Sequence, residues 1–176
     1  MVEKTLRKKK LLIAALIVVA LLYFLLGRYD VSATKPHPAI VSVILHSVTE
    51  RSIQRNSAGL EVPYDVDDEN MYVEGFKEYE EMCVQCHGAP GVELSSTGKG
   101  LFPKPPRFPS EEFNEYSLKD IFWVMKNGIK MTGMPAYGPT HEDETIWAVA
   151  IFLDKSRDLS EAEYKSLRDK YSGTHH

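Results

Sequence analysis

The stretch Cys83-Val84-Gln85-Cys86-His87 carries the clearest structural signal in the sequence. Its two thiols lie three positions apart, and a histidine directly follows the second one. This spacing lets both sulfurs add to the vinyl groups of one haem while the imidazole coordinates the haem iron. The stretch therefore predicts one covalently attached haem c, with Cys83 and Cys86 as thioether positions and His87 as an iron ligand.

Other uses of such a cysteine pair fit the chain less well. The chain has only these two cysteines, so a zinc site of four Cys/His ligands would need distant histidines. A disulfide framework would consist of a single bridge. A thioredoxin-like redox pair needs a βαβ setting, and no alternation of strands and helices surrounds the motif. Haem attachment is therefore favoured.

A second iron ligand is expected in the stretch Met131-Thr132-Gly133-Met134-Pro135. The glycine and the proline let the backbone fold sharply over a flat cofactor. A thioether is a soft ligand, and a His/Met pair favours ferrous iron and so raises the haem potential. On these grounds alone, the sulfur can come from either methionine.

The first 30 residues are predicted to anchor the chain in a membrane. A basic flank at residues 4–10 precedes an uninterrupted apolar run over residues 11–26. A helix of that length extends about 24 Å, at the short end of what crosses a bilayer core of roughly 30 Å. The basic flank should stay in the cytoplasm. This predicts a single-pass protein of the bacterial inner membrane, with the remaining chain on the periplasmic side.

A cleaved signal peptide is the alternative interpretation of this segment. Val31-Ser32-Ala33 has the small residues of a cleavage site, but Arg28 and Asp30 precede it. The apolar run is also longer than the usual upper limit of about fifteen residues. A retained anchor is therefore favoured.

Residues 31–66 are expected to link the anchor to a globular domain. Residues 39–57 have apolar side chains near helical spacing, which predicts an amphipathic helix. Its apolar stripe could lie on the membrane, pack on the globular domain or meet another subunit. His46 lies in this stripe and is interpreted as a structural histidine. The acidic run over 65–69 is interpreted as a solvated linker or helix start, and a calcium site is a weaker alternative.

Residues 67–176 form the predicted globular domain with a C-terminal helical extension, and the expected fold class is all-α. Three pairs have the spacing of a capping box at a helix start: Ser117 with Asp120, Thr140 with Asp143, and Ser160 with Glu163. The expected helices cover residues 71–82, 117–126, 145–155 and 160–171.

These features together resemble a membrane-anchored monohaem cytochrome c of the class I type. The resemblance covers roughly residues 70 to 156, and the sequence elements that carry it are Gly75, Tyr79, CVQCHG, TGMPA and WAVAIFL. It implies a small all-helical domain around one haem. It also implies that Met134, flanked by Gly133 and Pro135, is the distal ligand rather than Met131.

The resemblance implies further contacts around the haem. The first and last helices of the domain should cross where Gly75 meets Phe152. A proline carbonyl, from Pro105 or Pro106, should hold the imidazole of His87. Large aromatic side chains supply apolar area around a porphyrin, and the residues expected in that wall are Tyr116, Phe122 and Trp123.

The charge distribution excludes some partners. The first 28 residues hold six basic groups and one acid, so their net charge is +5. Because the whole chain has a net charge of −4, residues 29–176 carry a net charge of −9. Nucleic acid is therefore an unsuitable partner, and redox proteins such as an oxidase, a reductase or a dehydrogenase are expected instead. Five basic residues could steer them to the haem edge, or belong to an ordinary mixed surface: Lys99, Lys104, Arg107, Lys126 and Lys130.

The predicted function is one-electron transfer between respiratory components, by an electron carrier rather than an enzyme. Two axial ligands would leave no open iron position, which argues against an oxygenase, a peroxidase or a gas sensor. The alternative is a fixed cytochrome subunit of a larger respiratory or dehydrogenase complex, with residues 36–58 as an assembly surface. A mainly structural anchor with an incidental haem is the third hypothesis.

Overall fold

The computed structural model describes residues 2–171 and consists of helices joined by loops. Within that range no strand forms, and only an isolated antiparallel bridge pairs Ala89 with Val92. The predicted all-α fold class is therefore confirmed. The last five residues of the predicted C-terminal extension, 172–176, lie outside the described residues.

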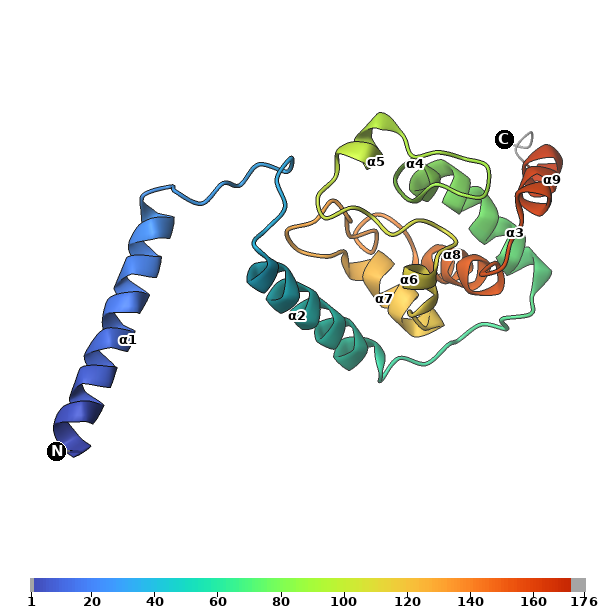
Figure 1. Cartoon of the computed structure of the whole chain (residues 1–176). Coiled ribbons are helices and arrows are strands. Elements are labelled where there is room, and N and C mark those ends of the chain that lie inside the picture. The colour runs from blue at the N-terminus through green and yellow to red at the C-terminus, as the bar shows by residue number, and fades with distance from the viewer. Residues whose placement is uncertain (1, 172–176) are drawn as a thin grey trace. The chain divides into compact units, whose positions relative to one another are not determined.

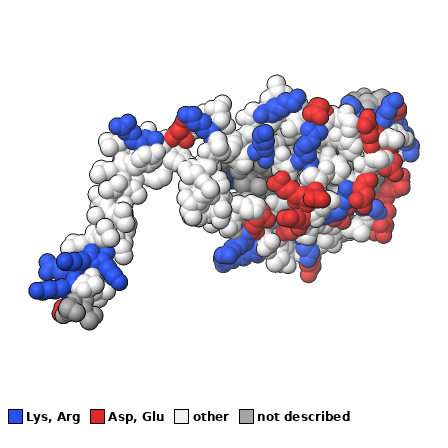
Figure 2. Space-filling model, in the orientation of Figure 1, with Lys and Arg blue, Asp and Glu red and all other residues white. Residues whose placement is uncertain are grey.

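The chain divides into two compact units, residues 1–35 and 36–176. The first unit contains α1 (Val2–Leu25), shown in Figure 1. The apolar side chains of this helix are exposed. Basic side chains gather at the N-terminal end of this helix (Figure 2). Among the helices in the described part of the chain, none combines the length and apolar content needed to cross a membrane. The structure therefore does not show the membrane span predicted at residues 11–26.

The second unit contains all the other helices (Figure 1). Between α3 and α4 the chain forms a π-helical turn, Tyr79–Cys83. The helix predicted over 71–82 is therefore α-helical only as far as Glu78, and the π-helical turn connects it to the cysteine motif. The helices of this unit are α2 (Ala39–Ser57), α3 (Glu69–Glu78), α4 (Val84–His87), α5 (Ser96–Gly100), α6 (Glu111–Asn114), α7 (Leu118–Asn127), α8 (Asp143–Lys155) and α9 (Glu161–Tyr171).

The core of the second unit forms where α3 crosses α8. A Cβ atom at Gly75 would lie 2.0 Å from the carbonyl oxygen of Ala148 and 2.9 Å from Cβ of Phe152. Only glycine permits this approach without a shift of one helix. Phe152 is fully buried and its ring lies 5.6 Å from that of Phe76. The predicted crossing of Gly75 and Phe152 is confirmed.

The helix α2 packs on the same unit through its C-terminal end, whereas four residues of its apolar stripe stay exposed: Ile40, Val43, Ile44 and Val48. Ile53 and Ser57 are buried against α7. The Ser57 hydroxyl donates a hydrogen bond to Oδ1 of Asp120. The other carboxylate oxygen, Oδ2, accepts hydrogen bonds from the backbone N–H (3.0 Å) and the hydroxyl (2.6 Å) of Ser117. Asp120 therefore completes the predicted capping box of α7 and also joins α7 to α2.

The other two predicted capping boxes have different outcomes. Ser160 and Glu163 form theirs at the start of α9, where the Ser160 N–H lies 2.9 Å from a Glu163 carboxylate oxygen. The prediction for Thr140 and Asp143 is wrong, because α8 begins after Glu142 and has no side-chain cap. The Thr140 hydroxyl instead donates to the carbonyl of Tyr137 at 3.2 Å, within the preceding turn.

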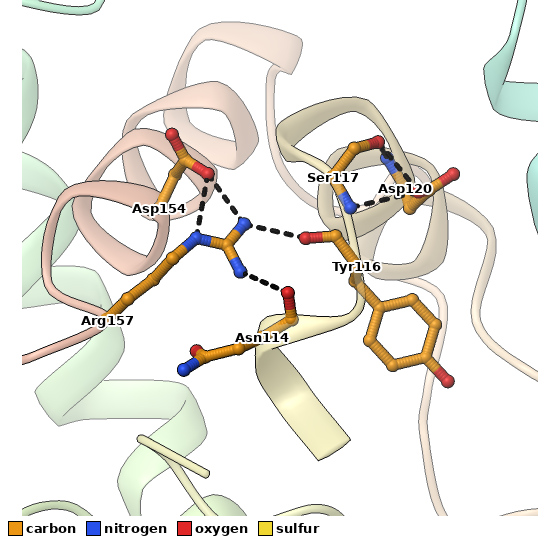
Figure 3. A network of polar contacts seen from close by, with 6 residues as sticks. All are labelled: Asn114, Tyr116, Ser117, Asp120, Asp154 and Arg157. Carbon is orange, nitrogen blue, oxygen red and sulfur yellow. Dashed lines mark hydrogen bonds and ion pairs between the residues drawn. The ribbon is translucent and has the colours of Figure 1, made fainter. Parts of the chain in front are cut away.

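A network around Arg157 holds the loop between α6 and α7 (Figure 3). Its guanidinium donates to the carbonyl of Asn114 at 3.0 Å and to that of Tyr116 at 2.6 Å. Asp154 fixes the guanidinium through an ion pair of 2.7 Å. Arg157 follows the last turn of α8, so this network joins the end of α8 to the segment that carries Tyr116.

Candidate functional site

One cavity of about 420 Å³ brings the four predicted site residues together. Cys83, Cys86, His87 and Met134 all line it, although Met134 lies 47 positions after His87 in the sequence. A volume of this size is in the range of small-molecule and cofactor sites, about 300–1,000 Å³. The remaining walls include the proline-rich loop over 101–106, the segment over 108–116, helix α7, the loop over 129–135, and one face of α2.

The π-helical turn positions the two cysteines. Cys83 ends this turn and Cys86 lies in α4. The hydroxyl of Tyr79, at the start of the turn, donates a 2.5 Å hydrogen bond to the carbonyl of Gly88, just after the motif. Both cysteines are free thiols, and burial, with help from nearby Glu78, raises the pKa of Cys83 to about 12. The thiols are therefore not joined to each other and remain available for a bond to a cofactor.

The imidazole of His87 is held by the proline-rich loop. Its Nδ1 lies 2.8 Å from the carbonyl oxygen of Pro106, so Nδ1–H donates and the Nε2 lone pair is left for a metal. Burial lowers the pKa of His87, and the hydrogen bond to Pro106 opposes this only in part. The neutral imidazole that a metal requires is therefore favoured. Of the two prolines considered, Pro106 makes the contact.

The two methionines of the second ligand loop have different environments. Met131 is 84% exposed and has a φ of 62°, in the left-handed region. Met134 is half-buried and packs against the hydrophobic core. The hydroxyl of Thr132 accepts a hydrogen bond from the Met134 N–H at 3.1 Å and donates to the carbonyl of Ile129 at 2.8 Å. Thr132 thus orients the Met134 backbone. The sequence contained this signal, because a threonine two positions before the methionine favours such a turn.

The predicted aromatic wall is present only in part. Tyr116 lines the cavity, and Phe108 and Phe113 join it there. Phe122 does not line the cavity, because its ring stacks on that of Trp147 with the centroids 3.8 Å apart. Trp123 does not line it either. Helical periodicity explains the difference, since Ile121, Val124 and Met125 are the α7 residues that face the cavity.

Helix α2 contributes a wall that the sequence did not predict. Five of its residues line the same cavity as His87 and Met134: Ser42, Leu45, His46, Thr49 and Glu50. His46, which the sequence analysis interprets as a structural histidine, is exposed and lines the cavity. The contact of α2 was missed because helical periodicity draws attention to the apolar residues of the helix, whereas four of the five lining residues are polar.

The five basic residues predicted near the haem edge do not share one environment. Arg107 and Lys126 form ion pairs with Glu93 (3.3 Å) and Asp143 (2.7 Å). Lys104 and Lys130 line the cavity. Acidic side chains are prominent elsewhere on the second unit (Figure 2). The surface is therefore mixed in charge, and of the five predicted basic residues only Lys104 and Lys130 border the cavity.

These residues fit a haem with two thioether bonds. Two free thiols at the required spacing border a mainly apolar cavity, with an oriented neutral imidazole and a thioether sulfur on its lining. Imidazole and thioether ligands suit haem iron, and two thiols followed by a histidine suit covalent attachment. The fold and the site together define a covalent-haem electron-transfer domain.

The comparison with protein families supports this class of protein. Residues 70–153 match the family described as cytochrome c oxidase, cbb3-type, subunit III. That stretch is a cytochrome c haem domain, and it contains both cysteines, His87 and Met134. No curated protein matches the chain.

Proposed function

We propose that the chain is a membrane-tethered electron carrier that passes single electrons between respiratory components at the periplasmic face of the bacterial inner membrane. His87 and Met134 would be the axial ligands, and Cys83 and Cys86 the covalent attachment points. The observation that carries this proposal is the shared cavity, in which His87 is oriented by Pro106 and Met134 by Thr132. When bound, the haem would supply a one-electron ferric/ferrous couple.

The protein residues would set how easily that couple is reduced. A neutral imidazole and a thioether add no negative charge to the iron, and this favours the ferrous state. The buried walls formed by Phe108 and Phe113 exclude water, which makes the more highly charged ferric state costlier. No residue of the chain needs to take part in bond chemistry, so the role is electron transfer rather than catalysis.

The membrane attachment rests on the N-terminal unit. The apolar side chains over residues 11–26 are exposed along α1, and a basic cluster precedes them. Apolar surface of this kind favours a lipid environment. A periplasmic position of the second unit follows from the basic flank, which favours the cytoplasmic side.

The first test is the chemistry of the purified full-length protein. We expect one covalently bound haem per chain, a reversible one-electron redox titration, and no change in the reduced spectrum under carbon monoxide. Carbon monoxide binding to the native reduced protein would contradict two permanent axial ligands and would favour a gas sensor. A protein without covalent haem would contradict the proposal altogether.

The second candidate is a fixed subunit of a larger complex, and the matched family favours it. The family description names a subunit of an oxidase, so an oxidase is the first partner to consider. Mild detergent extraction of native membranes, followed by a native gel stained for haem, separates the candidates. Migration near the mass of the single chain, 19.9 kDa plus detergent, supports a tethered carrier. Migration with a much larger assembly supports a subunit.

A further inference from the structure

The helix α2 lies outside the stretch that matches the cytochrome family, yet it forms part of the cofactor cavity. The match begins at residue 70, whereas α2 ends at Ser57. The buried contact of Ser57 with Asp120 fixes the C-terminal end of α2 on α7. Tyr116 donates a 2.6 Å hydrogen bond to Glu50, which ties the middle of the helix to the cavity wall. The N-terminal half of α2 is thereby held against the cavity.

Three polar side chains of α2 that line the cavity have no partner among the residues that the structure describes. His46, Ser42 and Thr49 line the cavity, and their side chains form no hydrogen bond or ion pair with any described residue. Three hydrogen-bonding groups that face one cavity and bond to no protein group are suited to a polar part of the ligand. Glu50 differs, because Tyr116 already occupies one of its carboxylate oxygens.

The position of the cysteines indicates which part of the haem reaches α2. The vinyl groups that form thioethers lie on one half of the macrocycle, and two carboxylates lie on the opposite half. The thiols come from the π-helical turn and α4, whereas His46 comes from α2. In Figure 1, α4 and α2 lie on opposite sides of the second unit, with the cavity bordered by both.

We infer that α2 supplies the binding site for the haem carboxylates, with His46 as its main hydrogen-bond donor and Ser42 and Thr49 as its neutral partners. This inference rests on the proposed function, because it requires a haem bound through Cys83 and Cys86. It assigns a cofactor-binding role to a segment outside the matched cytochrome domain. His46 is a positioning residue here, since it acts on the iron only through the carboxylates.

Charged groups of both signs line the cavity. The basic groups are His37, His46, Lys104 and Lys130, and the acidic groups are Glu50 and Glu112. A hydrogen bond from the His46 imidazole to a haem carboxylate would offset part of the negative charge of that carboxylate. Less negative charge near the iron favours the ferrous state, so this hydrogen bond should raise the midpoint potential.

The experiment compares midpoint potentials of the full-length haem protein at pH 7. In the His46→Leu variant, whose side chain cannot donate a hydrogen bond, we expect a lower potential than in wild type. His46→Gln keeps a side-chain N–H and should have a potential closer to that of wild type. Val48→Gln is the matched control, because Val48 is 61% exposed and does not line the cavity. The His37→Gln variant measures the contribution of the second imidazole.

The possible outcomes separate this inference from the proposed function. If the wild-type protein carries normal covalent haem and His46→Leu has the same midpoint potential as wild type, the inference is overturned and the proposed function stands. A shift in potential produced by Lys104→Gln but not by His46→Leu also overturns the inference, because the carboxylates would then lie on the opposite wall. A wild-type protein without covalent haem overturns both.

Discussion

At the scale of single residues, the proposed iron ligation depends on which of two methionines supplies the sulfur. Met131 and Met134 are three positions apart and chemically identical, so only their surroundings distinguish them. Met134 packs against the core and its N–H is held by Thr132, whereas Met131 is 84% exposed. A ligand needs an oriented sulfur, and the ordered side chain supplies it at a lower entropic cost.

Replacement of Met134 should therefore remove the distal ligand. In ferric Met134→Ala we expect complete loss of the sulfur-to-iron charge-transfer band, with binding of carbon monoxide to the reduced form. Ferric Met131→Ala is the matched control and should keep the band. Absorption spectra of the two oxidised variants provide the measurement. If the band survives in Met134→Ala and disappears in Met131→Ala, the assignment of the ligand is wrong.

Asp120 links two helices through one carboxylate, and its charge state should influence stability. Burial raises its pKa, but the hydrogen bonds from Ser117 and Ser57 together outweigh burial, so the pKa is lowered overall. The folded state therefore stabilises the ionised form. This contribution is complete above the ordinary aspartate pKa of about 3.9 and is lost as the pH falls through the lower folded-state pKa.

The Asp120→Ala variant tests this contribution. At pH 7 we expect its free energy of unfolding to fall by about 1–3 kcal/mol, because the capping box of α7 loses its carboxylate and the buried Ser57 hydroxyl loses its hydrogen bond to Asp120. The difference from wild type should shrink below about pH 4. Denaturant unfolding followed by circular dichroism measures both effects. Asp158→Ala is the control, since Asp158 is exposed. An equal loss in the control would contradict the assigned role.

At the scale of helices, the crossing of α3 and α8 is the contact on which the domain depends most. Every residue of α8 from Ile146 to Leu153 is buried, so this part of the helix is covered on all sides. The helix α3 contacts it at Gly75. The crossing also determines where the π-helical turn leaves α3, and so where the cysteine motif meets the cavity. A small change in the distance between these helices therefore affects both stability and the site.

Gly75→Ala should force the two helices apart. The added methyl group would lie 2.0 Å from the backbone oxygen of Ala148, which cannot move without a shift of α8. We expect destabilisation of about 1–3 kcal/mol or more, seen as a lower thermal midpoint of the haem protein. Gly59→Ala is the matched control, because no atom lies within 4 Å of the added Cβ. Its effect should stay within about 0.5 kcal/mol. Equal melting temperatures for both variants would contradict this account of the crossing.

At the scale of the whole molecule, the division into two units predicts separable properties. Among the residues whose burial the structure describes, all the buried hydrophobic ones lie between Ile53 and Tyr164, within the second unit. Residues 3–35 therefore contribute no side chain to the core. They contain the apolar run over 11–26 and the basic cluster that precedes it.

Proteolytic removal of residues 1–35 from the purified haem protein should leave the haem in place and abolish membrane binding. We expect an unchanged haem spectrum and a thermal midpoint close to that of the full-length protein, because the core remains intact. Full-length protein should stay in the membrane pellet after carbonate washing, whereas the shortened protein should be released. Retention of the shortened protein in the pellet would place the membrane contact elsewhere in the chain.

The sequence alone was sufficient for the local features. The spacing of Cys83, Cys86 and His87 determines the cofactor chemistry, because covalent attachment depends on neighbours in the chain. The helix start at Ser117 was predictable for the same reason, since a capping box involves residues three positions apart. The error at Thr140 shows the limit of that reasoning: its hydroxyl binds the preceding Tyr137 carbonyl instead of the next helix.

The tertiary structure decided the features that depend on distant residues. It selected Pro106 rather than Pro105 for His87, it removed Phe122 from the cavity wall by stacking it on Trp147, and it placed α2 against the cavity. Arg157 likewise holds the Tyr116 segment through a contact more than 40 positions long. The physical reason is common to all four contacts. Periodicity and spacing describe the order of chemical groups along one chain segment, whereas packing determines which distant segment completes each contact.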